Sequence, residues 1–249
     1  IANGVNDDTA ALQLCLNSGK KIRLPSGTIK VTSTLNLISG NSFLSGTEYL
    51  GFATTVIKPS EDFIGESLFS INGENIGGGW GFRSCLSNIV IWTPHQYGEN
   101  LTSIINIKKS YTIMLEKLWL YQTPKVGVTL NGNNNIHLDK IFISGIGNNN
   151  SGSIGIDCQT DGANGGIYIN DCDIENVQKC ISQKTNSKVF LTNPFFERYG
   201  TGWEAVGNET GYFGINGGRF INTSTSSSCG NIRGHNVNVF GGSYLDNGG

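Results

Sequence analysis

The chain has few charged residues and no long apolar segment. Aspartate, glutamate, lysine and arginine make up 14% of its 249 residues, and the net charge is −2. Lysine and arginine form no basic stripe, which argues against a nucleic-acid-binding protein. No apolar run approaches about 20 residues, so the sequence contains no candidate membrane span. The histidines, His95, His137 and His235, lie too far apart in the sequence to suggest a paired base and nucleophile.

The cysteines give no sign of a metal site or a disulfide framework. The six are Cys15, Cys85, Cys158, Cys172, Cys180 and Cys229, and they show no metal-ligand spacing. Cys15 and Cys172 stand in apolar patterns and are interpreted as small core residues. This usage favours folding in a reducing compartment. No cofactor and no metal are predicted.

Glycine, with 35 residues, and asparagine are abundant, and one apolar pattern occurs six times. Apolar or small residues stand at positions i, i+2, i+5 and i+7, with a polar or glycine-containing corner between i+2 and i+5. The six units are Ile113/Leu115/Leu118/Leu120, Ile136/Leu138/Ile141/Ile143, Ile167/Ile169/Cys172/Ile174, Val189/Leu191/Pro194/Phe196, Phe213/Ile215/Gly218/Phe220 and Val237/Val239/Gly242/Tyr244. Their first residues are 23, 31, 22, 24 and 24 positions apart. A near-constant period built from short alternating segments is typical of a stacked solenoid.

Each unit predicts two short strands, and further apolar segments between the units predict a third. These segments are Val126/Val128, Ile154/Ile156, Cys180–Ile181, Trp203–Val206 and Ile232. The sequence therefore predicts an all-β fold, a right-handed single-stranded parallel β-helix with three strands per coil, as one domain over residues 1–249. The competing β-sandwich explains the alternation but not the constant inward register. The 31-residue step is interpreted as a loop insertion at Gly145–Ser153.

A short capping helix is predicted before the coils, at about residues 7–18. Asn6 to Thr9 supply N-cap chemistry, Leu12, Cys15 and Leu16 form an apolar face, and Gly19 ends the helix. Such a helix would cover the exposed core of the first coil. Coils are expected from about residue 22 to residue 249, beginning with strands at 22–24 and 29–37.

The N-terminal segment resembles the pectate-lyase-like β-helix superfamily, which is common in bacteriophage tailspikes. The matching segments run from Gly4 to Gln13 (GVNDDTAALQ) and from Leu24 to Val31 (LPSGTIKV). The resemblance implies a homotrimeric phage tailspike that binds or depolymerises a bacterial polysaccharide, either capsule or O-antigen. It also implies a protein made in the host cytoplasm, carried on the virion and placed in contact with the bacterial surface. No nucleic-acid or membrane partner is expected.

Outward positions are the candidates for chemistry, because the inward ones are used for packing. Position i+6 places Trp119, Phe142, Asp173, Phe195, Arg219 and Ser243 in one column. Position i+8 places Tyr121, Ser144, Glu175, Glu197, Ile221 and Leu245 in the next column. Neighbouring coils lie about 4.8 Å apart. Asp173, Glu175 and Glu197 are therefore expected to share one patch.

Three carboxylates in one patch suggest glycoside hydrolysis. A glycosidase needs one protonated and one ionised carboxyl group, and repulsion between neighbouring carboxylates separates their pKa values. Asp173, Glu175 and Glu197 are the predicted catalytic residues. Arg198 and Arg219 are predicted to hold an acidic sugar or to keep the second carboxylate charged. The competing interpretation treats Glu197–Arg198 and Asp173–Arg219 as surface ion pairs.

The aromatic residues have two interpretations. Trp119 and Tyr121, at the edge of the patch, are predicted to contact glycan. Other outward apolar side chains either stack on sugar rings or lie between three parallel chains, and the trimer interface is favoured. They are Met114, Phe142, Tyr168, Phe190 and Phe195.

Other functions stay open. Asp157 and Glu204, on the third strands of nearby coils, form a rival acidic site. Asp171 with Asp173 would suit a calcium-dependent polysaccharide lyase. A non-catalytic, glycan-binding adhesin on the same fold is the first alternative to the hydrolase, and a lyase or epimerase is the second.

Overall fold

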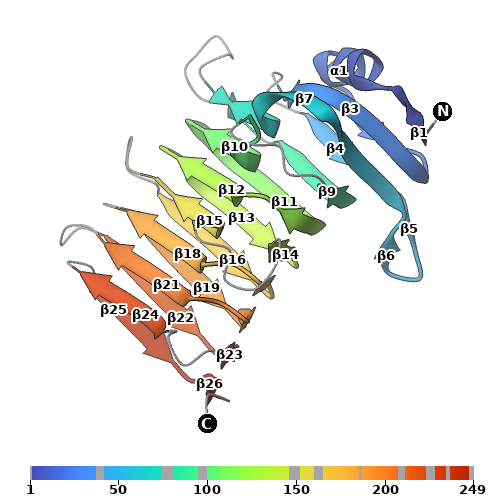
Figure 1. Cartoon of the computed structure of the whole chain (residues 1–249). Coiled ribbons are helices and arrows are strands. Elements are labelled where there is room, and N and C mark those ends of the chain that lie inside the picture. The colour runs from blue at the N-terminus through green and yellow to red at the C-terminus, as the bar shows by residue number, and fades with distance from the viewer. Residues whose placement is uncertain are drawn as a thin grey trace.

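The computed structural model describes residues 2–37, 42–73, 81–82, 84–94, 100–145, 152–159, 165–184, 187–206, 211–222, 228–233 and 236–246. It confirms the predicted parallel β-helix with one short helix, α1 (Thr9–Asn17), at the N-terminal end (Figure 1). His95, His235, most of the predicted insertion at 145–153 and the last three residues lie outside the described residues. No helix in the described ranges is long and apolar enough to cross a membrane.

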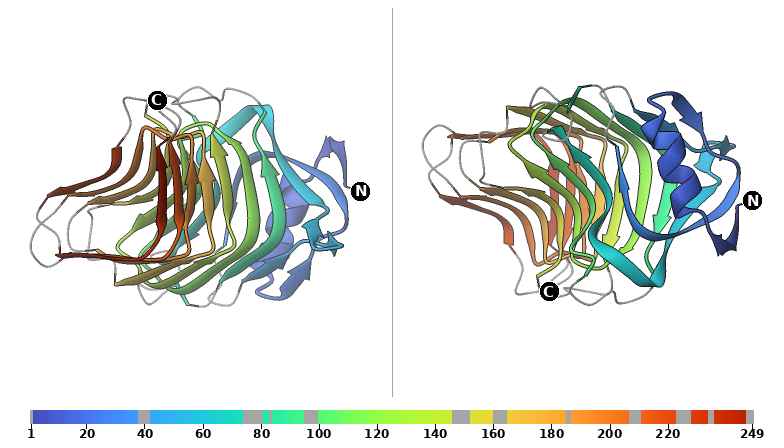
Figure 2. Two further views of the ribbon diagram at one scale, coloured as in Figure 1. Left: turned by 90° about the horizontal axis from the view of Figure 1, so that it is seen from below. Right: turned by 90° about the horizontal axis from the view of Figure 1, so that it is seen from above.

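The strands pair in parallel and form three faces around one core (Figure 2). The first face contains β2 (Lys21–Arg23), β4 (Phe43–Ser45), β8 (Gly81–Phe82), β13 (Asn134–Asp139), β16 (Gly166–Asn170), β19 (Lys188–Thr192), β22 (Tyr212–Asn216) and β25 (Asn236–Phe240). The second face contains β1 (Asn3–Asp7), β14 (Phe142–Gly145), β17 (Asp173–Glu175), β20 (Phe195–Glu197), β23 (Arg219–Asn222) and β26 (Ser243–Asp246). The third face contains β10 (Ser103–Lys108), β12 (Val126–Asn131), β15 (Ile154–Cys158), β18 (Lys179–Lys184), β21 (Thr201–Val206) and β24 (Ser228–Arg233).

Four longer strands bend at a corner and belong to two faces. They are β3 (Gly27–Asn36), β7 (Thr55–Asn72), β9 (Cys85–Trp92) and β11 (Ser110–Thr123). A separate antiparallel hairpin, β5 (Glu48–Tyr49) and β6 (Phe52–Ala53), projects from the N-terminal coils (Figure 1).

The register between coils is the one that the repeat predicts. Ile113 pairs with Ile136, Ile136 with Ile167, Ile167 with Val189, and Val189 with Phe213. All five side chains are buried. Corresponding residues of consecutive coils therefore stack in columns, and each inward column forms one strip of a continuous core.

The corner between the first and second faces places its second residue in the left-handed region. These residues are Lys117, Lys140, Asp171, Asn193 and Gly217, with φ between 48° and 72°. A left-handed conformation costs a residue other than glycine about 1–2 kcal/mol. At four of these corners the backbone N–H donates a hydrogen bond to the next coil, as from Asp171 to the carbonyl of Thr192 at 2.9 Å. The cost is thus offset at these four corners, because their backbone N–H groups keep a hydrogen-bond partner.

The helix α1 covers the N-terminal end of the coil (Figure 2). Leu12 and Leu16 are buried against the first coil, and Gly19 ends the helix with φ of 66°. The interpretation of Cys15 as a core residue is wrong, because its side chain is exposed. The helix is so short that only one narrow stripe, formed by Leu12 and Leu16, reaches the core.

The stacked core predicts a large effect from one inward truncation. Ile143 is fully buried between Leu120 and Ile174 of the adjacent coils. We expect Ile143→Ala to lower the free energy of unfolding by about 2–5 kcal/mol, because the rigid columns cannot close the cavity. Urea unfolding followed by circular dichroism measures the loss. The exposed Leu14 of α1 is the control, and Leu14→Ala should change stability by less than about 0.5 kcal/mol. Equal effects of the two variants would contradict the stacked core.

Candidate functional site

The three predicted catalytic carboxylates lie together on the outer surface of the second face. Glu175 of β17 pairs in register with Glu197 of β20, one coil away. Asp173 stands two residues before Glu175 on β17, so its side chain points to the same side of the strand. Both predicted columns are present in the structure, and they place the carboxylate cluster (Asp173, Glu175 and Glu197) in one patch.

Arg198 bridges the two glutamates. Its guanidinium contacts Oε2 of Glu175 through Nη2, and Nη1 lies 3.0 Å from Oε1 of Glu197. Its Nε donates a hydrogen bond of 2.9 Å to Oδ1 of Asn176. The side chains of Glu175 and Glu197 are only 16% and 26% exposed, so these ion pairs are partly shielded from water. The arginine therefore offsets the repulsion between two carboxylates on adjacent coils.

The backbone explains how Arg198 reaches both partners. Arg198 and Asn176 occupy the corner that follows the second face, with φ of 52° and 57°. The N–H of Asn176 donates to the carbonyl of Glu197, which ties the two corners together at 3.2 Å. This left-handed corner holds Arg198 directly after Glu197 and beside Glu175. The sequence predicted Arg198 as a substrate-binding residue, whereas in the structure all three of its described contacts are to Asn176 and the two glutamates.

Asp173 has a different environment from the glutamates. In its column it pairs with Phe142 on one side and Phe195 on the other. Burial, together with the negative charges of Glu175 and Glu197, raises the pKa of Asp173 to about 6 against the opposing effect of Arg198. Its Oδ1 is buried and makes no hydrogen bond. The cluster therefore combines one carboxyl group that is readily protonated with two that are paired to a cation.

Of the two surface ion pairs in the competing interpretation, the structure contains one. Glu197 and Arg198 do form a pair. Among the ion pairs between described residues, however, none joins Asp173 to Arg219. Arg219 instead places its guanidinium 5.8 Å from the ring centroid of Phe195, a cation–π contact beside the cluster. Its exposed position leaves it available to an anionic group of a ligand.

The predicted glycan-binding aromatic residues lie on the same two columns. Trp119 pairs with Phe142, which precedes Asp173, and Tyr121 pairs with Ser144, which precedes Glu175. Trp119 and Tyr121 line a cavity of about 190 Å³ together with Phe52, Ala53 and Val90. Sequence reasoning missed the contribution of the hairpin, because residues 48–53 lie outside the repeat. The only available signal was an apolar run around a glycine turn, Tyr49–Phe52.

A second aromatic column, on the first face, is used within the protein. The rings of His137, Tyr168, Phe190 and Tyr212 follow one another with centroid separations of 4.8, 5.3 and 5.1 Å. Each inner ring has a neighbouring ring on either side along the column. A sugar ring stacks on an uncovered face of an aromatic ring, and the faces of the inner rings are covered by their neighbours. This column is therefore not a stacking platform for glycan.

The rival acidic residues do not form a carboxylate pair. Asp157 and Glu204 lie in one column of the third face, but Ser182 of the intervening coil separates them. Asp157 is 3.5 Å from Nζ of Lys184, and Glu204 pairs with Lys179. Each carboxylate thus pairs with its own lysine, and a full coil lies between the two carboxylates.

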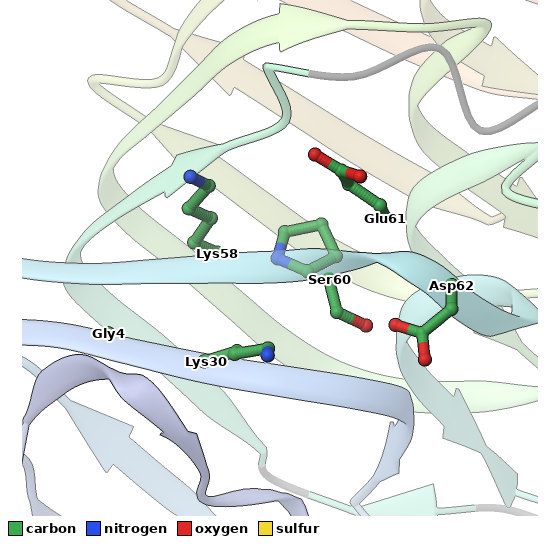
Figure 3. Close-up of a pocket in the computed structure, with 7 residues that line it drawn as sticks. Gly4, Lys30, Lys58, Ser60, Glu61 and Asp62 are labelled. Carbon is green, nitrogen blue, oxygen red and sulfur yellow. The ribbon is translucent and has the colours of Figure 1, made fainter.

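A polar cavity of about 400 Å³ lies at the N-terminal end of the second face (Figure 3). Lys30 and Lys58, which pair in register, line it with Glu61 and Asp62. Nζ of Lys58 also lies 4.9 Å from the ring centroid of Trp92. The cavity contains equal numbers of acidic and basic side chains, so it has no excess of either charge. Sequence reasoning missed it, because the first coils were not aligned with the repeat.

No group of three or more His, Cys, Asp or Glu residues is arranged to hold a metal ion within the described part of the chain. Asp171 and Asp173, the residues considered for a calcium-dependent lyase, lie on either side of Cys172. Asp171 occupies the left-handed corner and is exposed, whereas Asp173 begins β17.

No protein-family model matches the chain, and no curated protein sequence matches it. Three solved structures illustrate the similarity in fold. The pre-mature gene product 12 of bacteriophage phi29 is 18% identical, with a TM-score of 0.69 over 96% of this chain and 33% of that chain. An endo-xylogalacturonan hydrolase from Aspergillus tubingensis is 15% identical, with a TM-score of 0.60 over 98% and 73%. PfbA, a surface adhesin of Streptococcus pneumoniae, is 12% identical, with a TM-score of 0.62 over 99% and 77%.

These identities are too low to transfer an activity, and this chain spans about a third of the length of the phage protein. The similarity instead extends over nearly the whole of this chain in each case. It agrees with the parallel register and the three faces described above. The chain therefore shares the parallel β-helix fold of these three proteins.

Proposed function

We propose that this protein binds a bacterial surface polysaccharide, either capsule or O-antigen, and hydrolyses its glycosidic bonds. The observation that carries the proposal is the environment of Asp173, a carboxyl group with a pKa of about 6 beside two salt-bridged glutamates. Glycoside hydrolysis needs this combination of a proton donor and an ionised carboxylate on one surface. The fold, shared with a polysaccharide hydrolase, is compatible with it.

In this mechanism Asp173 is the general acid. It donates its proton to the glycosidic oxygen as the bond from that oxygen to the anomeric carbon breaks. Glu197, the more exposed of the two glutamates, accepts a proton from the water that attacks the anomeric carbon. Arg198, which is also paired with Glu175, holds Glu197 in place, and the negative charge of Glu175 stabilises positive charge at the anomeric carbon. Proton exchange with solvent then restores Asp173 as the acid and Glu197 as the base.

The substrate lies, in this proposal, along the outer surface of the second face. Trp119 and Tyr121 stand in the same columns as the carboxylates and offer aromatic surface on one side of them. Arg219 stands on the other side, one coil beyond Phe195. The site thus has apolar contacts toward the N-terminal coils and a cation toward the C-terminal coils, which suits a polymer with an acidic sugar.

The proposal includes assembly as a homotrimer on a phage virion. The fold is shared with a bacteriophage gene product. The outer surface also carries exposed apolar side chains, such as Met114, that three parallel chains would cover. A spike of this kind is made in the cytoplasm of the infected cell and meets its polysaccharide at the surface of the next host.

A glycan-binding adhesin is the second candidate function. Arg198 favours it, because its ion pairs with both glutamates leave neither carboxylate free to act without moving. A reducing-sugar assay on purified capsule and O-antigen separates the two. Binding without release of reducing ends supports the adhesin, and the absorbance of an unsaturated uronate product would identify a lyase instead.

Removal of the proton donor tests the catalytic assignment. We expect Asp173→Asn to lower the rate of reducing-end release by about 10²- to 10⁴-fold, because general acid catalysis is lost. Binding to the same polysaccharide should be retained, since the amide has the size of the carboxyl group. Glu197→Gln should lower the rate by a similar factor. Full activity in both variants would overturn the assignment of the site.

The raised pKa of Asp173 also predicts how stability depends on pH. The folded chain holds this proton up to about pH 6, whereas the unfolded chain releases it near the ordinary value of 3.8. Stability therefore falls as the pH rises through this window, because the folded chain binds the extra proton. Asp173→Asn removes the effect. We expect the variant to melt at a higher temperature than the wild type at about pH 8, and the difference to disappear below about pH 4. Thermal melts across this range measure it, and a difference that does not change with pH would contradict the assigned environment.

A further inference from the structure

The hairpin β5–β6 is held firmly against the coil. Oγ1 of Thr47 lies 3.0 Å from Oγ1 of Thr54 and 3.1 Å from Oγ1 of Thr55, which joins the two ends of the hairpin. Glu48 forms an ion pair of 3.6 Å with Lys117 of β11, two coils beyond the strand β4 that precedes the hairpin. Leu50 and Gly51, with φ of 50° and 84°, make the tight turn. These contacts hold the hairpin beside the second face.

The hairpin exposes three large apolar side chains. Tyr49, Leu50 and Phe52 are 70%, 80% and 69% exposed. Exposed apolar groups that lie close together usually mark a binding surface, because their exposure to water is unfavourable. Phe52 contributes to the 190 Å³ cavity with Val90, Trp119 and Tyr121, so the hairpin and the coil enclose one apolar space from two sides. Glu48 of the hairpin and Lys117 of β11 form an exposed ion pair.

The register connects this cavity to the carboxylate cluster. Trp119 pairs with Phe142, and Phe142 pairs with Asp173. The cavity floor therefore lies two coils from the proposed acid, about 9.6 Å at the usual spacing of about 4.8 Å per strand. Trp119 makes no ring contact with another described aromatic residue, unlike the rings of the column on the first face. Its half-buried ring lines the cavity.

We propose that the hairpin cavity is a second sugar subsite for the polysaccharide whose bond is cut at the carboxylate cluster. This inference rests on the proposed function. The occupant is a pyranose ring of the same polymer, one disaccharide unit from the cleaved bond. Its C–H groups pack against the negative face of the Trp119 ring, and Phe52 closes the opposite side. Trp119 stands in the same column as Asp173, two coils away, which favours a polymer lying along the solenoid over a second protein chain.

The subsite predicts that the affinity for an oligosaccharide depends on the length of that oligosaccharide. An oligosaccharide long enough to reach from Asp173 to Trp119 gains the aromatic contacts, and a shorter one does not. The test uses Asp173→Asn as the background, so that the ligand is not cut. The probes are capsular polysaccharide and O-antigen from a panel of strains, and oligosaccharides of increasing length made from the bound polymer by partial acid hydrolysis. Binding is measured by calorimetry.

We expect Phe52→Ser in this background to weaken binding of the polymer and of long oligosaccharides by about tenfold or more, and to leave short ones unchanged. Trp119→Ala should have the same effect. Phe240→Ser is the matched control, because Phe240 is 64% exposed and lies on the first face. Circular dichroism shows whether each variant is folded. If Trp119→Ala does not fold, Phe52→Ser still tests the subsite, because Phe52 is an exposed side chain.

Two other outcomes overturn the inference and are distinct from failure of the proposed function. If Phe52→Ser binds every probe as tightly as Phe240→Ser while Asp173→Asn abolishes cleavage, the function stands and the subsite does not exist. If Phe52→Ser dissociates an oligomer in sedimentation experiments without changing the affinity for glycan, the hairpin binds a second copy of the chain. If the unaltered protein binds no polysaccharide in the panel, the proposed function itself fails, and the subsite fails with it.

Discussion

Parallel pairing in register between consecutive coils is the constraint on which the rest of this structure depends. A single coil has two open strand edges and an apolar interior that it cannot cover. Pairing with the next coil satisfies the backbone and covers the interior only when equivalent residues lie over one another, as Ile136 does over Ile113. At the N-terminal end, α1 takes the place of a further coil through Leu12 and Leu16.

The same constraint creates the chemistry of the outer surface. A column that repeats a side chain on adjacent coils also repeats its charge, and Glu175 is thereby forced beside Glu197. Arg198, placed by its left-handed corner, offsets that repulsion. Asp173 has no such cation of its own and stands between two phenylalanines in its column, so its proton is held more tightly. One repeated geometry thus yields carboxyl groups of two kinds.

The repeat made much of this site predictable. Because the period aligns residues 173, 175 and 197, their proximity followed from the spacing alone, as did the placement of Trp119 and Tyr121 two coils away. The pairing of Arg198 with Glu197 was predicted as an ion pair, but its contact with Glu175 was not, since that contact depends on the direction in which a corner residue projects. The hairpin contribution of Phe52 was not predictable either, because an insertion carries no periodic signal. Cys15 fitted the helical pattern but faces solvent, since α1 packs along only one stripe.

The sequence by itself determined the coil, the inward columns and which side chains share an outer face. It could do so because alternation along a strand and a constant step between coils fix the direction of every side chain. Only the tertiary structure decided which polar groups pair, which carboxyl group is left without a partner and where the inserted hairpin lies. Those outcomes depend on distances between side-chain ends and on burial, and neither is specified by a period.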